Sequence, residues 1–368
     1  IQSELVRSWS IDGSGKTIIF NIVQGARFHD GSNVTAQAVK WHFDRMMDPE
    51  VGSPNKGDVK SIQSTSLIDD YTMALHLHYP DRALLATLAG GYPGVVESPT
   101  GVLDNNSYDD VLGSYGRAPT GSGPFKIKEY QPDVKIIMER NDDYWVGSLP
   151  YLDGVEMIHV PDSQARLAMV RTGDADIIGG GSGLVNAREA LNDQVRDNPN
   201  IKLITLPRSR MNSIGISTDV APYSNPDLRA AMAYSIDRQT LADTYFVGGA
   251  VPAYSPIAVG WGHNPDIKIY DFDLAKGKAA LAKAGFTPGS DLTMWSRGTT
   301  AALELTEIYQ AMMKEVGINV VIEQVPSADY WQSVIKRKSH LVARWRGARP
   351  DPGRFIHQVF HSEGQGNV

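Results

Sequence analysis

An alternation of strand and helix patterns in the C-terminal part of the chain constrains its fold more than any other feature. Apolar residues recur there with helical or strand periodicity, in the order helix, strand, helix, strand, helix, strand, over residues 273–284, 292–295, 305–316, 318–322, 327–336 and 341–345. This order is typical of an open α/β sheet with crossover helices. Such sheets bind ligands beyond the carboxyl ends of their strands, so the sequence predicts a site at that edge.

Two stretches follow strands at the predicted edge. They read WSRG at 295–298 and WRGARPDP at 345–352, and each contains an indole and guanidinium groups. Arginine binds a carboxylate in a bidentate manner, so these stretches suit an acidic ligand. For each residue alone, the alternative is a core tryptophan or a solvated arginine, but two such stretches at one edge favour a binding site. The candidates are Trp295, Arg297, Trp345, Arg346, Gly347, Arg349 and Asp351.

The rest of the chain predicts a mixed α+β body. We expect hairpins at 5–30 and 121–140, a strand at 72–79, a helix at 35–47 capped by Thr35, a helix from 161 to Gly173, a strand at 174–178, a helix begun by Asn225-Pro226 and another at 237–247.

The string DGSGKT at residues 12–17 resembles the end of a phosphate-binding loop. The full motif needs a glycine at position 10, where this chain has Ser10. A helix must also follow it, whereas Thr17 to Val23 is rich in β-branched residues and predicts a strand. We therefore interpret the string as the turn of a β-hairpin.

Composition and motifs exclude several other functions. The net charge of −7 argues against nucleic-acid binding. The chain has no cysteine, which excludes disulfides, thiolate metal sites and cysteine nucleophiles. It has no run of 18 apolar residues, so the sequence predicts no membrane-spanning helix. His357 and His361 have the spacing of a zinc-protease helix, but Gln358 replaces the catalytic glutamate. No nucleophile–base pair is visible, so we predict no enzyme activity, no catalytic residues, no cofactor and no metal. A hydrolase is the competing class.

Several motifs occur in the order that characterises one protein family. They are WSIDGSGKT at 9–17, FHDGSNVTAQAV at 28–39, GSGPF at 121–125, RNDDYW at 140–145, PYLD at 150–153, NPDLRAA at 225–231 with IDR at 236–238, and DP at 351–352. Together they resemble the family 5 extracellular solute-binding proteins, the peptide, nickel and glutathione receptors of ABC importers. The resemblance covers essentially the whole chain.

The resemblance implies an α/β, mixed α+β fold with two hinged lobes and an extra subdomain in lobe I, like other periplasmic binding proteins. Lobe I is expected at 1–215 and lobe II at 216–368, with the chain crossing near Met211 to Val220. Family members are longer at both ends. We therefore expect the first strand segment of lobe I, and the end of lobe II with its return to lobe I, to be missing.

The resemblance also suggests ligand residues. Arg297 fits the arginine that holds the peptide carboxylate in dipeptide-binding members. Those members hold the peptide amine with an aspartate where this chain has Ala348. This departure favours a more negatively charged solute, such as a glutathione-like compound, or a sugar. The predicted ligand-binding set is completed by Met211, Asn212 and Tyr92.

The expected function is capture of a small solute, a peptide or peptide-like compound, for delivery to a membrane permease. A sugar, an opine or a metal chelate is the alternative ligand, and a ligand-sensing regulatory module on the same fold is a further class. The expected partners are the solute and the ABC permease, with no nucleic acid. The expected protein is monomeric and periplasmic or extracellular, with lipid anchoring to the membrane surface left open.

Overall fold

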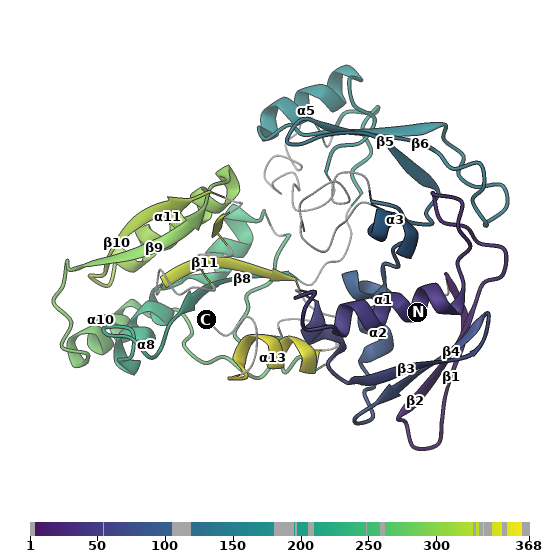
Figure 1. The fold of residues 1–368 in the computed structure, drawn as a ribbon. Coiled ribbons are helices and arrows are strands. Elements are labelled where there is room, and N and C mark those ends of the chain that lie inside the picture. The colour runs from purple at the N-terminus through teal and green to yellow at the C-terminus, as the bar shows by residue number, and fades with distance from the viewer. Residues whose placement is uncertain are drawn as a thin grey trace. The chain divides into compact units, whose positions relative to one another are not determined.

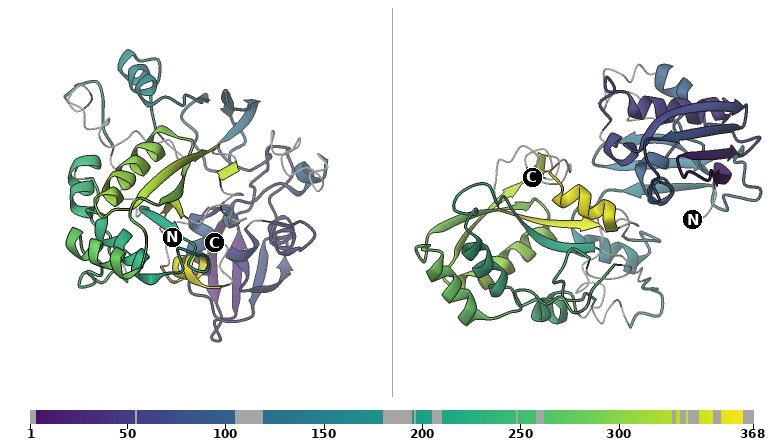
Figure 2. Two further views of the ribbon diagram at one scale, coloured as in Figure 1. Left: turned by 90° about the vertical axis from the view of Figure 1, so that its left-hand side faces the viewer. Right: turned by 90° about the horizontal axis from the view of Figure 1, so that it is seen from below.

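A computed structural model gives the fold in two compact units, Ile1–Val160 and Pro161–Val368. The structure describes residues 4–53, 55–104, 119–179, 195, 197–204, 210–247, 249–257, 262–326, 329–330, 334, 341–347 and 352–362. Each unit is described by itself (Figures 1 and 2).

The first unit contains two antiparallel sheets and short helices. Its elements are β1 (Val6–Ile11), β2 (Thr17–Ile22), α1 (Ala36–Met47), η1 (Lys56–Val59), β3 (Ile62–Asp69), β4 (Thr72–Leu77), α2 (Leu84–Gly90), η2 (Tyr92–Gly94), α3 (Pro99–Asp104), β5 (Phe125–Gln131), β6 (Lys135–Arg140) and β7 (Gly154–Ile158). The strand orders are β1-β2-β4-β3 and β5-β6-β7.

Helix α1 packs against the first of these sheets. The Thr35 hydroxyl accepts a hydrogen bond from the backbone N–H of Ala38, which satisfies one free donor of the first turn. Val39, Phe43 and Met46 recur on one face and are buried with the apolar residues of β2 and β4. The predicted helix, its cap and its apolar face are confirmed.

The second unit is built around a mixed sheet. Its elements are α5 (Ser163–Thr172), β8 (Arg210–Ile216), α8 (Pro226–Ser235), α9 (Arg238–Thr240), the π-helix η3 (Leu241–Tyr245), α10 (Leu274–Lys283), β9 (Asp291–Arg297), α11 (Thr300–Lys314), β10 (Asn319–Val325), β11 (Leu341–Gly347) and α13 (Pro352–Phe360). The sheet order is β10-β9-β11-β8.

Strands β9, β10 and β11 run parallel, as the alternating pattern predicts. Helices α8, α10 and α11 lie on one side of the sheet and share a buried cluster with its strands, including Met294, Tyr309 and Leu341 (Figures 1 and 2). A smaller cluster containing Trp295 and Val342 covers the opposite face. Leu341 and Val342 are adjacent in β11, so this division follows the alternation of side chains along a strand.

Three predictions for this unit have different outcomes. The strand expected at 174–178 is wrong: the N–H groups of Asp174 and Ala175 both donate to the Met169 carbonyl and wrap the end of α5, and Ile177 is 85% exposed. The helix expected from Ser327 falls largely outside the described residues. The helix at 237–247 is confirmed, but its second turn is the wider π-helix.

Candidate functional site

Strand order places a topological switch point at the end of β9. β10 lies on one side of β9 and β11 on the other, so the connections that leave β9 and β10 diverge. A crevice forms where crossovers diverge, and open α/β sheets bind ligands at that point. β9 ends at Arg297, and the parallel strand β11 ends at the same edge of the sheet, at Gly347.

Strand β8 brings a distant segment to this edge. It pairs with β11 in the antiparallel sense, with Asn212 opposite Trp345, Met211 opposite Arg346 and Arg210 opposite Gly347. Predicted ligand residues that are separated by more than a hundred positions in sequence therefore lie side by side in the sheet. The pairing is a property of the backbone and supports their assignment to one site.

Trp295 contributes to the core beneath this edge. Its side chain is 7% exposed and belongs to the cluster with Val325 and Val342. Its indole Nε1 donates to Oε2 of Glu323 on β10 at 2.9 Å. A buried indole with its donor already satisfied supports the strand ends, and the role of Trp295 in ligand binding stays a prediction.

Arg297 is the last residue of β9 and is half-buried. The turn after it is fixed by two backbone hydrogen bonds, from Gly298 N–H to the Val325 carbonyl at 2.8 Å and from Thr299 N–H to the Arg297 carbonyl at 2.7 Å. The neighbouring Ser296 hydroxyl is buried and lies 3.0 Å from Oγ1 of Thr306 on α11. Arg297 therefore extends from a rigid strand end.

Arg344 is a charged residue of this sheet that the sequence analysis missed. A Cβ atom added to Gly215 of β8 would lie 2.1 Å from Arg344 Nε, so the guanidinium crosses β8 where that strand has no side chain. Burial lowers the pKa of Arg344, and the nearby Tyr330 hydroxyl raises it. The Tyr330 hydroxyl donates to the Ala343 carbonyl at 2.5 Å. The missed signal was an arginine in a run that otherwise reads as a buried strand.

The remaining predicted residues are less informative. Arg349 and Asp351 lie outside the described residues. Tyr92 belongs to the first unit, begins η2 and is 78% exposed. It precedes Pro93, whose carbonyl lies 3.1 Å from Nε2 of the buried His42.

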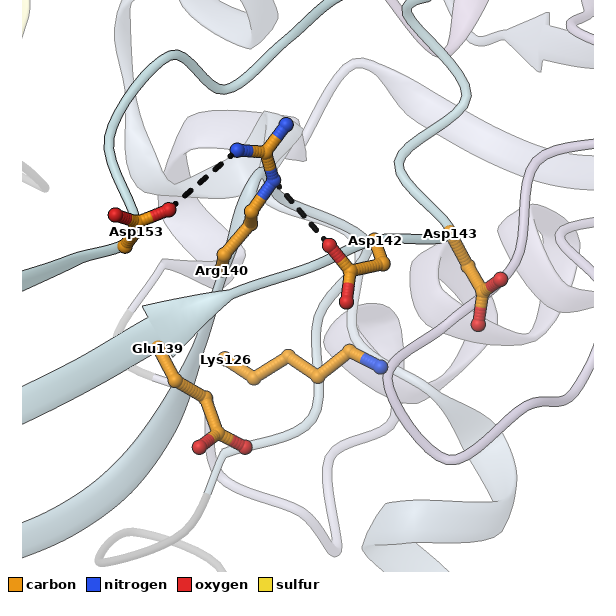
Figure 3. A pocket seen from close by; sticks show the side chains of 6 residues that line it. All are labelled: Lys126, Glu139, Arg140, Asp142, Asp143 and Asp153. Atoms are coloured by element: carbon orange, nitrogen blue, oxygen red, sulfur yellow. Dashed lines mark ion pairs between the residues drawn. The ribbon is translucent and has the colours of Figure 1, made fainter.

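A charged hollow in the first unit is a weaker candidate (Figure 3). Lys126, Glu139, Arg140, Asp142, Asp143 and Asp153 line it. Nε of Arg140 pairs with Asp142 at 3.2 Å, and its Nη1 lies 3.7 Å from Asp153. The side chains of these two aspartates are 88% and 103% exposed, so water already solvates the charges and a ligand gains little there.

No group of three or more metal-binding side chains occurs within the part of the chain that the structure describes. The rings of His357 and His361 stack at 4.3 Å on α13, and two histidines supply half of a tetrahedral zinc site. None of the described helices is long and apolar enough to cross a membrane.

The DGSGKT string forms the turn between β1 and β2. Asp12 Oδ1 accepts hydrogen bonds from the N–H groups of Lys16 at 3.0 Å and Thr17 at 3.1 Å. These bonds close the turn. A hydrogen bond from the Ser14 hydroxyl lowers the pKa of Asp12, and the bonds from the Thr17 and Lys16 N–H groups lower it further. A strand follows, so the hairpin interpretation is confirmed.

Comparison with known proteins identifies the scaffold. Residues 1–367 match the model of the bacterial extracellular solute-binding proteins, family 5. The chain belongs to this family. The match confirms the resemblance carried by the sequence motifs. Because these are solute-binding proteins, it also supports the prediction of a binding protein over that of an enzyme.

One relative of this solute-binding protein is the glutathione-binding protein GsiB of Salmonella paratyphi A. The two chains are 26% identical over 323 residues, which is 88% of the solute-binding protein and 60% of GsiB. The solute-binding protein thus spans about 60% of the length of this curated relative.

Two solved structures show the same fold. The binding protein MoaA of A. tumefaciens R10, in complex with mannopinic acid, has a TM-score of 0.86 at 24% identity, over 98% of the solute-binding protein and 71% of MoaA. The ABC transporter-associated periplasmic binding protein DppA of Helicobacter pylori, in complex with peptide STSA, has a TM-score of 0.80 at 27% identity, over 96% and 71% of the two chains. The predicted periplasmic-binding-protein fold is confirmed.

Proposed function

We propose that this chain captures a small, carboxylate-bearing, peptide-like solute and delivers it to the membrane permease of an ABC importer. The observation that carries the proposal is the position of Arg297 at the carboxyl end of β9, at the switch point of a family 5 sheet. A guanidinium on a rigid strand end is well suited to bind a carboxylate, because little conformational entropy is lost when the hydrogen bonds form.

Family membership supports the remaining features of the proposal. The protein works outside the cytoplasm as a monomer, either free or anchored to the membrane by lipid. Two lobes, at 1–215 and 216–368, close on the solute, and the differential affinity of the closed state for solute drives closure. Met211, Asn212, Trp345, Arg346 and Gly347 form the sheet edge that receives the solute, with Tyr92, Arg349 and Asp351 as further ligand residues.

The proposal is tested by substituting Arg297, the residue proposed to bind the carboxylate. Arg297→Ala should weaken binding of a carboxylate solute about 10-fold to 100-fold, because a hydrogen bond to a charged group contributes about 1.5–3 kcal/mol. Native mass spectrometry of the purified protein identifies any retained solute, and isothermal titration calorimetry measures its affinity.

Arg229→Ala is the matched control. Arg229 carries the same charge in the same unit, and its Nη1 donates to the carbonyls of Tyr223 and Ser224 at the start of α8. Unchanged affinity in Arg297→Ala, or an equal loss in the control, would contradict the assigned site.

A further inference from the structure

The turn η2 carries exposed apolar side chains on a buried centre. Tyr92 is 78% exposed and Val95, directly after the turn, is 67% exposed, whereas Pro93 between them is buried. Hydrogen bonds close its backbone, from the Gly94 N–H to the Gly91 carbonyl at 3.2 Å and from the Val95 N–H to the Tyr92 carbonyl at 3.0 Å. Single exposed apolar side chains are common on protein surfaces, so what distinguishes this turn is the set of contacts that hold its backbone.

Contacts with two helices fix this segment on both sides of Val95. A Cβ atom added to Gly94 would lie 1.9 Å from the Leu88 carbonyl oxygen of α2, so the turn packs directly on that helix. On the other side, Nη1 of Arg45 on α1 pairs with Glu97 at 2.8 Å. A side chain that protrudes from a restrained backbone loses little conformational entropy when it binds a ligand.

His42 of α1 holds the centre of the turn. Its side chain is 5% exposed, and its Nε2 lies 3.1 Å from the Pro93 carbonyl. Burial lowers the pKa of His42, so the ring is neutral at pH 7 and carries one proton. A carbonyl oxygen only accepts hydrogen bonds, so this proton lies on Nε2 and is donated to Pro93.

The other ring nitrogen of His42 shows that this contact has a cost. Nδ1 is buried without a hydrogen-bond partner among the described residues, and Oε1 of Glu97 lies 4.0 Å from it. A buried polar atom without a partner destabilises a fold. The neighbouring residues of the same buried face, Val39, Phe43 and Met46, are apolar. An apolar residue at position 42 would avoid this cost, so fixing the Pro93 carbonyl gives the histidine a purpose.

We propose that His42 is a positioning residue, which holds η2 so that Tyr92 meets an apolar group of the solute. The inference rests on the proposed function, in which Tyr92 is a ligand residue. It goes beyond that function by assigning a role to His42 and by giving the solute an apolar group. Tyrosine suits this contact because its ring supplies a large, rigid apolar surface with few rotatable bonds.

The contact at Tyr92 is tested with two pairs of probes that differ in an apolar group. S-benzylglutathione adds a benzyl group to glutathione, and Met-Leu has apolar side chains that Gly-Gly lacks. Calorimetry on the purified protein should show the apolar member of at least one pair binding about 10-fold more tightly, as expected for burial of such a group. Tyr92→Ala should remove most of this preference. Tyr151→Ala, which removes a tyrosine that is 82% exposed in the same unit, should keep it.

A double-mutant cycle then tests the role of His42. His42→Leu removes the donor and should reduce affinity for the preferred apolar probe about 5-fold when Tyr92 is present, but less than about 2-fold in the Tyr92→Ala background. A merely structural role would lower affinity equally in both backgrounds. His42→Gln keeps a side-chain N–H donor and should retain affinity within about 2-fold. His78→Leu, at an exposed histidine of the same unit, is the control.

The outcomes separate this inference from the proposed function. Circular dichroism establishes that each variant is folded, and if His42→Leu does not fold, His42→Asn, whose side chain is too short to replace the Nε2 donor, takes its place. Equal losses in the two backgrounds, an equal loss in His42→Gln, or binding without an apolar preference that depends on Tyr92 overturns the inference, while Arg297→Ala still decides the proposed function. Binding of none of the four probes by the wild type overturns both. A loss confined to the background that retains Tyr92 supports the inference.

Discussion

The two main sheets of this protein use their polar residues in opposite ways. In the antiparallel sheet β1-β2-β4-β3 and its loops, the motif residues bind one another. Asp30 accepts hydrogen bonds from the Ser32 N–H, the Ser32 hydroxyl and the Ser98 hydroxyl, and Nε2 of His29 lies 3.0 Å from the Gly123 carbonyl. In the sheet β10-β9-β11-β8, Arg297 is the half-buried last residue of β9, and the Arg344 guanidinium of β11 lies across Gly215 of β8.

This difference explains why the residues that identify the family are not the residues proposed to bind the ligand. The strings around DGSGKT and FHDG identify the family, and residues such as Asp12, His29 and Asp30 within them bind backbone or loop partners of the scaffold. Arg297 at the end of β9 differs from them in that strand formation itself does not require an arginine, because many residue types can end a strand. These sequence motifs therefore report the scaffold, and the proposed ligand residue Arg297 lies outside them.

The largest losses of unfolding free energy are expected from substitutions in the apolar cores. They test whether the two sheets have independent cores. Phe43 and Met294 are buried in separate clusters, one in each unit. Phe43→Ala should cost about 3–5 kcal/mol and Met294→Ala about 2–5 kcal/mol of unfolding free energy, because each leaves a cavity. Differential scanning calorimetry should show each variant shifting a different transition.

The exposed Ile68 provides the control for this comparison. Ile68→Ala should change the unfolding free energy by less than about 0.5 kcal/mol, as is usual for surface substitutions. A single transition that Phe43→Ala and Met294→Ala lower alike would show that the units unfold as one body.

An intermediate effect on the free energy of unfolding is expected for the hydrogen bonds that Asp30 accepts from Ser32 and Ser98. Asp30→Ala removes the acceptor of the fully buried Ser98 hydroxyl and should lower the unfolding free energy by about 1–2 kcal/mol. Asp12→Ala removes a comparable set of bonds at an exposed turn, where water replaces them, so its effect on stability should be smaller. Urea denaturation measures both, and equal losses would contradict the role assigned to burial.

The smallest expected effect is a change in how the unfolding free energy of the first unit depends on pH. Burial lowers the pKa of His42, while the Pro93 carbonyl and Glu97 act against this and Arg45 adds to it. Burial likewise lowers the pKa of His29. The unfolded chain therefore takes up protons first, so the stability that these residues contribute is present above about pH 6.5 and is lost as pH falls below it.

His42→Gln should flatten the decline of unfolding free energy between about pH 7 and pH 5 without abolishing it, since His29 contributes with the same sign. His78→Gln, at an exposed position, is the control. An identical decline in wild type and His42→Gln, measured by urea denaturation at each pH, would contradict the assignment.

Local patterns predicted most of the fold. Caps at Thr35, Asn225 and Asp273 begin helices as expected, and glycines with positive φ, among them Gly285 and Gly317, end them. These signals act within a few residues, so one sequence suffices to detect them.

Pairing between distant segments was harder to predict. β8 joins the sheet through partners such as Ser213 and Arg344, which lie 131 residues apart, and no local pattern specifies that register. For the same reason, only part of the candidate site could be predicted from the sequence. Arg297 could be named from its strand end, whereas Arg344 becomes a candidate only when Gly215 is known to lie beneath its guanidinium.

The order β10-β9-β11 has a consequence for how ligand specificity can evolve. The bodies of these strands are committed to two apolar clusters, so substitution there costs stability. The last residue of β9, Arg297, is only half-buried and belongs to neither apolar cluster, so its identity can change at less cost to folding. Proteins with this scaffold can therefore diversify by replacing a few residues at strand ends. Relatives that share about a quarter of their residues with this chain, and whose ligands include glutathione, mannopinic acid and a peptide, are the outcome such an arrangement allows.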